Sequence, residues 1–212
     1  MNSFLMDRQP RHLLAREALS TSDSQTLWRL ASGALRIDSS ATLDAPRAFV
    51  RLALPGDFLG VESLVGVTDQ LWVRALTPAR LVPVVVLDQG QLTQLLMDAV
   101  LKGHQRCREV VSLRTGSALE RVKRLLLMLA GDGNEDGAGE VREATVCALP
   151  NLNDMATIIN AAPETVCRVL ASLRELNFLE DCSPPSARNY HLELREHRLR
   201  PGKSLSSTTL TS

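Results

Sequence analysis

The hydrophobic pattern of this chain changes its period once, near Gln91, and this change limits the folds open to it. Before that point, residues 27–87 are short β-rich runs separated by turn residues; the runs are LWRL, ALRI, AFVRLAL, FLGVESL, LWVRAL and RLVPVVVL. After it, two stretches without proline repeat apolar residues at helical spacing, LTQLLMDAVLKGHQRCREVVSL and SALERVKRLLLMLA. The pattern predicts a β sandwich or jelly roll followed by two long helices.

The first long helix carries a seam of positions spaced alternately by four and three. Its members are Leu92, Leu96, Ala99, Gly103, Arg106, Val110 and Leu113. Pairing between two helices requires this spacing, so we expect a dimerisation helix. The seam is imperfect, because Gly103 costs about 1 kcal/mol of helix propensity and Arg106 is a poor core residue. An ordinary amphipathic helix lying on its own barrel is the alternative.

The stretch 151–176, NLNDMATIINAAPETVCRVLASLREL, contains two short helical runs separated by a turn. Asn151 can cap the first helix, with Asp154 three residues later in a variant of the capping box. The turn needs a residue that tolerates positive φ, and Asn160 is second only to glycine in this respect. Pro163 suits the first position of the second helix. The apolar side of the first helix is Met155, Ile158 and Ile159.

The second helix of this pair has an apolar face and a polar face. The apolar face follows i, i+3, i+4, i+7 spacing and comprises Val166, Val169, Leu170 and Leu173. The opposite stripe comprises Glu164, Cys167, Arg168 and Ala171. A helix-turn-helix presents the first turns of its second helix to base edges, where glutamate accepts from cytosine and arginine bonds guanine. Glu164 and Arg168 therefore predict DNA recognition, and the alternative is a surface ion pair at i, i+4.

Two β-rich pieces follow the helix pair around a Pro-Pro turn and predict a hairpin, the wing of a winged helix-turn-helix. The tail from Pro201 onward is polar, which is typical of disorder. We therefore expect an α+β protein with four parts. They are an N-terminal β jelly-roll domain at 1–90, a dimerisation helix at 91–117, a winged helix-turn-helix domain at 118–198 and a disordered tail at 199–212.

Charge and cysteine content limit the function further. The chain has 24 basic and 24 acidic residues and a formal net charge of zero, so any DNA-binding surface must be local. The N-terminus lacks an apolar signal region and no run reaches about 18 apolar residues, so we expect a cytoplasmic protein that does not cross the membrane. Scattered cysteines predict neither a zinc site nor a disulfide framework. No catalytic constellation is present, and we expect no enzyme activity and no cofactor.

The segment NDMATIINAAPETVCRVLASLRELNFLE resembles the winged helix-turn-helix of the Crp/Fnr transcription regulators, whose recognition helices carry an E-T-x-x-R core. Upstream, LWRLASGALRI, FVRLALPGDFLGVESLVG and LWVRALTPARLVPV resemble the cyclic-nucleotide-binding-type barrel of that family. The resemblance covers about residues 27–195. It implies a homodimer on half-sites with a TGA-type core, and contact with RNA polymerase. A two-fold dimer predicts a palindrome of about 14 to 22 base pairs.

The resemblance also assigns roles to single residues. It implies base contacts from Glu164 and Arg168, and the threonine between them supports the phosphate backbone. Cys167 occupies a position that touches bases in some members, whereas Pro163 departs from the polar or basic residue that the family often has. Arg188, at the turn of the wing, is a candidate phosphate contact or a solvated arginine. The candidate DNA-binding set is Asn151, Pro163, Glu164, Thr165, Cys167, Arg168 and Arg188.

The positions that hold cyclic AMP in related barrels differ here. Cyclic-AMP-binding members carry a Gly-Glu pair for the ribose and an Arg-Ser pair for the phosphate, which needs a cation. This chain has Gly60-Val61 and Asp69-Gln70 there, and Glu62 is displaced by one residue, onto the opposite face of a strand. We expect no cyclic-nucleotide binding, and an effector that is unknown or absent. The effector-pocket candidates are Gly60, Val61, Glu62, Asp69 and Gln70.

The linker between the long helices and the winged domain has two interpretations. Residues 132–143 match the EF-hand pattern D-x-N-x-D-G-x5-E, which would bind calcium. Gly139 stands where an apolar residue normally pairs between such loops, and the following VREATVCALP is typical of a strand and a turn. A flexible acidic loop is the simpler interpretation.

Other chemistry has weaker support. No cysteine precedes Cys107, so the clustered N-terminal ligands of an Fnr-like iron–sulfur cluster are absent. His12, His104 and His191 are single candidates for a haem ligand. Cys167 is either a redox switch or a small residue fitted against DNA. A cupin-like enzyme needs clustered histidines, and none lies between His12 and His104. The remaining alternative is a barrel-based small-molecule or protein-binding module.

Overall fold

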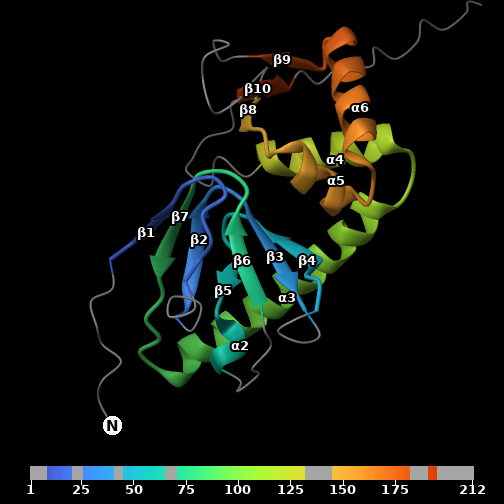
Figure 1. Ribbon diagram of the computed structural model, residues 1–212. Helices are drawn as coiled ribbons and strands as arrows, with labels where there is room; N and C mark the ends of the chain where they lie inside the picture. The colour runs from blue at the N-terminus through green and yellow to red at the C-terminus, as the bar shows by residue number, and fades with distance from the viewer. Residues whose placement is uncertain are drawn as a thin grey trace, which may run out of the picture.

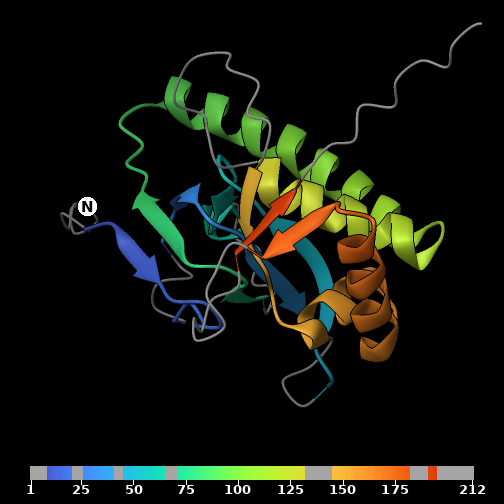
Figure 2. The same cartoon turned by 90° about the horizontal axis from the view of Figure 1, so that it is seen from above.

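The computed structural model describes residues 9–20, 26–40, 45–64, 71–131, 145–181 and 191–194. A β barrel occupies one end of the molecule, a group of helices with a small sheet occupies the other, and one long helix runs along the barrel to the group of helices (Figure 1). Seen from above, the long helix follows one edge of the barrel and ends near the helix pair (Figure 2). The α+β architecture predicted from the sequence is confirmed.

Two antiparallel sheets form the barrel, with strand orders β1-β7-β2-β5 and β4-β3-β6. Irregular register in β2 and β3 marks bulges, which increase the local twist of a sheet. Side chains that alternate along the strands fill the interior, where Leu30, Leu35 and Leu81 are fully buried. The strands are β1 Arg11–Leu13, β2 Trp28–Ser32, β3 Leu35–Ser39, β4 Ala48–Ala53, β5 Phe58–Leu59, β6 Leu71–Ala75 and β7 Ala79–Pro83.

Two details of the barrel differ from the sequence prediction. The prediction missed β1, which pairs with β7, because three residues carry too little periodicity to identify a strand. The run FLGVESL is not one strand: β5 ends at Leu59, Gly60 adopts φ +82°, and Val61–Leu64 is the helical turn α2. The placement of Glu62 on a strand is therefore wrong, because the left-handed glycine ends the strand before it.

The long helix α3, Gln89–Arg114, lies against the barrel through the seam predicted for dimerisation. Arg106 and Leu113, two members of that seam, are 7% and 0% exposed. These two members pack on the chain's own barrel, while the other five members of the seam are half-buried. The packing of Arg106 and Leu113 fits the alternative interpretation, an amphipathic helix on its own barrel, and the dimerisation role of α3 stays a prediction.

Arg106 shows how a charged residue is accommodated in that seam. Its Nε donates to the carboxylate of Asp57 at 2.8 Å, and its Nη1 donates to Glu109 at 2.7 Å. Burial by itself lowers the pKa of the Arg106 guanidinium, but the hydrogen bonds to Asp57 and Glu109 outweigh it and raise that pKa above its ordinary value. Because Asp57 follows β4 in the PGD turn, this ion pair attaches α3 to the barrel.

The second long helix, α4, spans Ala118–Gly131 and begins with a capping box. The Ser117 hydroxyl accepts from the Glu120 N–H at 3.3 Å, and the Glu120 carboxylate accepts from the Ser117 N–H at 2.9 Å. The bond from the Ser117 backbone N–H, followed by that from its hydroxyl, lowers the pKa of the Glu120 carboxyl. The cap fixes where α4 starts after the short turn from α3.

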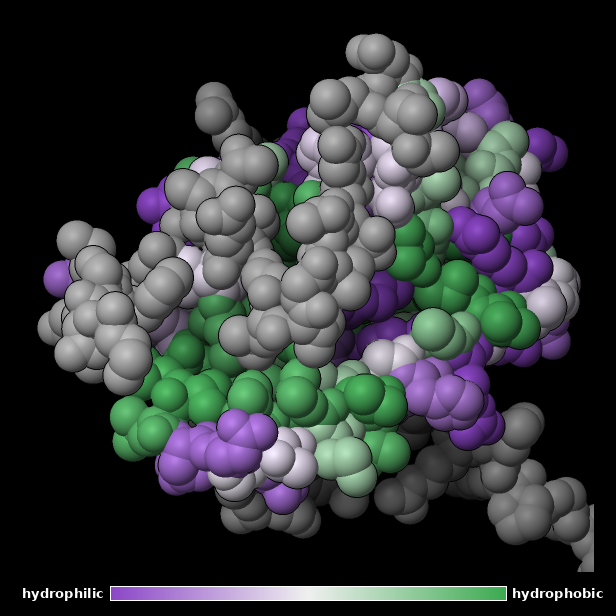
Figure 3. Space-filling model, turned by 90° about the horizontal axis from the view of Figure 1, so that it is seen from below, coloured by the Kyte–Doolittle hydropathy of each residue, from purple (hydrophilic) through white to green (hydrophobic). Residues whose placement is uncertain are grey.

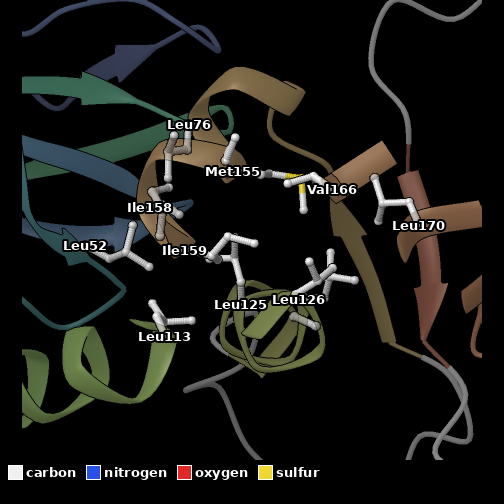
Figure 4. Packing of buried hydrophobic residues seen from close by; sticks show 14 of the residues in the cluster. Leu52, Leu76, Leu113, Leu125, Leu126, Met155, Ile158, Ile159, Val166 and Leu170 are labelled. Atoms are coloured by element: carbon white, nitrogen blue, oxygen red, sulfur yellow. The ribbon is translucent and has the colours of Figure 1, made fainter. Parts of the chain in front are cut away.

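One hydrophobic core joins the barrel to the helices (Figure 4). Leu52 and Leu76 from the barrel point toward Ile158 of the helix pair, with Leu113 of α3 and Leu125 of α4 on the adjacent side. Each of these side chains is 4% exposed or less. Because the cluster is continuous, the barrel and the helices bury apolar surface against each other rather than separately.

Candidate nucleic-acid interface

The predicted helix-turn-helix is present, and three local features set its turn. The Asn151 side chain accepts from the Asp154 N–H at 2.9 Å, as predicted for a cap. Asn160 ends the first helix with φ 53° and ψ 61°, the left-handed conformation expected of it. Pro163 is the first residue of the second helix. The helices are α5, Leu152–Ile159, and α6, Pro163–Glu175.

Arg121 of α4 supports the same turn from outside. Its Nη1 donates to the carbonyl oxygens of Ile159 at 2.5 Å and Asn160 at 3.0 Å. These carbonyls lie at the C-terminal end of α5, where a cation is favourable. Sequence reasoning missed Arg121, because the contact depends on how α4 and α5 meet in the fold.

The two faces of α6 are those predicted from the sequence. Val166, Leu170 and Leu173 are at most 3% exposed and belong to the shared core, while Val169 is half-buried against it. The opposite stripe faces solvent and comprises Glu164, Cys167, Arg168 and Ala171. The helix therefore presents both chemically useful side chains outward at its N-terminal end.

Glu164 and Arg168 do not form the surface ion pair that was the alternative interpretation. Among the contacts of the described residues, the one that joins them is a 3.4 Å hydrogen bond from Arg168 Nε to the backbone carbonyl of Glu164. That bond is long and leaves both side-chain head groups available to a ligand. One carboxylate and one guanidinium, a helical turn apart, are the groups that read neighbouring base pairs.

The other predicted contacts differ in accessibility. Pro163 and Thr165 are half-buried in the first turn of α6. Asn151 is half-buried, and its side-chain amide donates to Asp154. Cys167 is exposed and, with Asn151, lines a cavity of about 770 Å³ between α6 and the barrel. The DNA-contact roles of these residues stay predictions.

A three-stranded antiparallel sheet of order β8-β10-β9 accompanies the helix pair. The predicted hairpin after α6 is confirmed, and the strand predicted before α5 joins it as a third member. Arg188, the EF-hand-like residues 132–143 and the tail 199–212 lie outside the described residues. The strands are β8 Thr145–Ala148, β9 Leu179–Asp181 and β10 His191–Leu194.

A buried charge cluster connects α5 to the barrel. Asp154 is 4% exposed, and its carboxylate accepts from Arg36 Nη1 at 3.0 Å and from Arg74 Nη2. Arg36, which is 7% exposed, also donates to Asp38 at 2.7 Å. The sequence predicted a local capping role for Asp154 and missed both arginines. They lie 118 and 80 residues away along the chain, beyond any local pattern.

A small cavity lies between the barrel and α3. A cavity of about 20 Å³ remains there, lined by Arg51, Asp57, Phe58, Ala99, Lys102 and Gly103. Lys102 Nζ donates to the Gly56 carbonyl at 2.5 Å, and Glu62 lies 4.0 Å from Arg51 Nη2. Such a volume holds about one water molecule. Asp69 and Gln70 lie outside the described residues, so the predicted effector pocket is described only in part.

Two kinds of feature are absent from the described residues. Among them, no three His, Cys, Asp or Glu side chains gather closely enough to hold a metal ion. No described helix combines the length and the apolar character needed to span a bilayer.

Solved structures share this fold. A CRP-family transcriptional regulator from Thermus thermophilus matches with a TM-score of 0.65 and 22% identity, over 88% of this chain and 92% of that chain. FixK2 from Bradyrhizobium japonicum matches with a TM-score of 0.60 and 22% identity, over 90% and 93% of the two chains. No family model and no curated protein matches the sequence. The chain thus has the fold of the Crp/Fnr regulators that its motifs resemble, and the predicted fold is confirmed.

Proposed function

We propose that this protein is a sequence-specific DNA-binding transcription regulator of the Crp/Fnr type. The observation that carries the proposal is the exposed pair of Glu164 and Arg168 at the start of α6, held by the Asn160 turn. Arginine bonds guanine O6 and N7 and glutamate accepts from cytosine N4, and a helix-turn-helix brings these side chains into the major groove. The fold shared with a CRP-family transcriptional regulator from Thermus thermophilus supports the same function. Contact with RNA polymerase is part of the proposal and rests on the resemblance.

The proposed operator is a palindrome bound by a homodimer, and the outer face of α3 supplies the pairing surface. Met97, Val100, Leu101 and Val111 are 62–69% exposed on this face, and such a row of apolar side chains marks an interaction site. A band of apolar residues crosses the molecule in the view from below (Figure 3). The residues spaced alternately by three and four along this stripe are Met97, Val100, His104, Cys107 and Val111. As the proposed dimer interface, this stripe takes the place of the seam that packs on the barrel.

Cys107 gives this dimer a direct test. In a parallel pairing about a two-fold axis each residue of the stripe meets its own copy, so mild oxidation is expected to produce a disulfide-linked dimer. Gel electrophoresis without reductant measures it. Cys107→Ser is expected to abolish the cross-link, whereas Cys167→Ser, which removes the other exposed thiol of the described chain, retains it.

The matched apolar variants test the same surface without cross-linking. Val100→Asp places like charges across the axis, which costs several kcal/mol and raises the dimer Kd about 100-fold or more. Leu14→Asp introduces the same charge at an apolar residue of the barrel that is 74% exposed, and is expected to leave the Kd unchanged. Sedimentation equilibrium measures the dimer Kd of both variants. A dimer unaffected by Val100→Asp would exclude this face.

Cyclic AMP is expected not to bind this protein. The residues at the phosphate-binding positions are Asp69 and Gln70, which offer no cation. Titration calorimetry with cyclic AMP should therefore show no saturable heat at micromolar concentrations, and micromolar affinity would contradict the prediction.

Selection of random duplex DNA by the purified protein, without ligand, tests the proposed function. Enrichment of a palindrome of about 14 to 22 base pairs is expected, since a two-fold dimer sets its recognition helices about one DNA turn apart. No enrichment at low salt, where phosphate contacts are strongest, would count against DNA recognition by the ligand-free protein. Weak binding that depends steeply on salt but selects no sequence would point to a non-specific role.

A further inference from the structure

The charge cluster around Asp154 lies between two units with different tasks. Arg36 and Arg74 belong to β3 and β6 of the barrel, while Asp154 belongs to the first turn of α5. Asp38 of the barrel balances the second arginine charge, so the cluster holds two cations and two anions. Buried charges are stable only when paired and hydrogen-bonded, so each member needs the geometry that brings the others to it.

The cluster restricts orientation in a way that the hydrophobic core does not. Apolar contacts between Ile158 and the barrel are non-directional, so they restrict the rotation of α5 less sharply than hydrogen bonds do. Hydrogen bonds between ionised groups are short and directional. On the side that Asn151 lines, packing is incomplete, since a cavity of about 770 Å³ separates α6 from the barrel. The ion pairs therefore supply the directional contacts on this side of α5.

We propose that Asp154 is a positioning residue for DNA recognition: through Arg36 and Arg74 it fixes the orientation of α6 relative to the barrel. α6 follows α5 through the turn that Asn160 and Arg121 hold, so an orientation imposed on α5 is passed to α6. The barrel carries α3 and its outer stripe, so the same contact sets the spacing of two recognition helices in a dimer. This inference rests on the proposed function and adds an orientation control that needs no ligand.

The spacing between half-sites is the readout that a purely stabilising role would not change. Selection of random DNA with Asp154→Asn is expected to enrich the parent half-site sequence, because Glu164 and Arg168 are intact, but with several spacings between half-sites. Affinity for the best-spaced parent site is expected to fall about 5- to 150-fold, the usual range for coupling between sites. Asp154→Asn keeps the shape of the side chain and leaves the Asp154 N–H bond to Asn151 available.

Asp57→Asn is the matched control. Asp57 is 1% exposed and forms a buried aspartate–arginine contact outside this cluster, with Arg106, and that contact attaches α3 and not α5. It is expected to lower thermal stability while leaving the orientation of α6 relative to the barrel, measured within one chain as described below, unchanged. The double variant Asp154→Asn/Arg74→Gln is expected to match Asp154→Asn alone, because both changes remove the same contact. An equally broadened orientation of α6 relative to the barrel in Asp57→Asn would reduce the effect to general stability and overturn the inference.

A distance measurement without DNA separates failure of this inference from failure of the proposed function. Spin labels at Arg80→Cys in the barrel and Ala171→Cys on α6, in protein whose four cysteines are replaced by serine, report the orientation within one chain. Excess unlabelled protein suppresses distances between chains. A narrow distribution is expected for the parent and a broad one for Asp154→Asn. Distance distributions of equal width in the parent and in Asp154→Asn overturn the inference, even where the parent selects DNA. Failure of the parent to select DNA refutes only the proposed function.

Discussion

Arg168→Ala is expected to abolish selection of the palindromic DNA site and to leave the fold intact. The Arg168 side chain is exposed, and its 3.4 Å bond to the Glu164 carbonyl is long and local, so truncation removes no core contact. A bidentate arginine–guanine pair gives about 1–3 kcal/mol of base discrimination, and a dimer makes that contact twice. The combined loss of about 2–6 kcal/mol corresponds to roughly 30-fold to 20,000-fold in affinity.

The measurement is selection of random duplex DNA, followed by titration of the enriched site at one fixed salt concentration. Arg80→Ala is the matched control, because Arg80 is an exposed arginine on β7 of the barrel and its loss changes the net charge equally. Arg80→Ala is expected to retain the parent affinity. An Arg168→Ala variant that enriches the parent palindrome would remove α6 as the base-reading element. Equal losses in the two variants would assign binding to overall charge.

The helix-turn-helix was predictable from the sequence because its determinants are local. An asparagine cap, an asparagine in left-handed conformation and a proline at the first helical position each act within a few residues, and the structure shows all three. The exposed stripe of α6 follows from helical periodicity for the same reason. Its candidate contacts Glu164 and Arg168 could thus be named before the fold was known.

The role of each α3 face was not predictable, because two faces of this helix carry spacings of three and four. One includes Arg106 and Leu113 and packs on the barrel; the other includes Met97 and Val111 and is exposed. Periodicity identifies both as helical stripes but carries no information on which one meets the barrel. The contact that places the first face on the barrel joins Arg106 to Asp57, 49 residues away along the chain. Without knowledge of this partner, an arginine in the seam is expected to disfavour burial.

The charge cluster of Asp154 escaped sequence reasoning for a related reason. A carboxylate three residues after a capping asparagine already has a sufficient local explanation, so nothing in the sequence calls for Arg36 and Arg74 as further partners. Barrel arginines on β3 and β6 likewise suit exposed strand positions. Only the packing of α5 on the barrel brings the three side chains together, and the predicted boundary at residues 118–198 gives no hint of that contact.

Ile158→Ala is expected to destabilise the barrel together with the helices, although Ile158 lies on α5. Its side chain is fully buried in the cluster that also contains Leu52 and Leu76 of the barrel. Removing a buried isoleucine side chain in this way costs about 2–5 kcal/mol, a large share of the roughly 5–15 kcal/mol typical of a folded protein. At about 2–4 °C per kcal/mol for a chain of this size, the shift in Tm is easily resolved.

Both tryptophans of the chain, Trp28 and Trp72, lie in the barrel, so their fluorescence reports its unfolding, whereas far-ultraviolet circular dichroism is dominated by the helices. Coincident transitions, shifted equally by Ile158→Ala, are expected from a shared core. Leu152→Ala on the same helix, where the side chain is 38% exposed, is expected to shift neither by much. A tryptophan transition that stays in place while the helices melt earlier would show that the barrel folds independently.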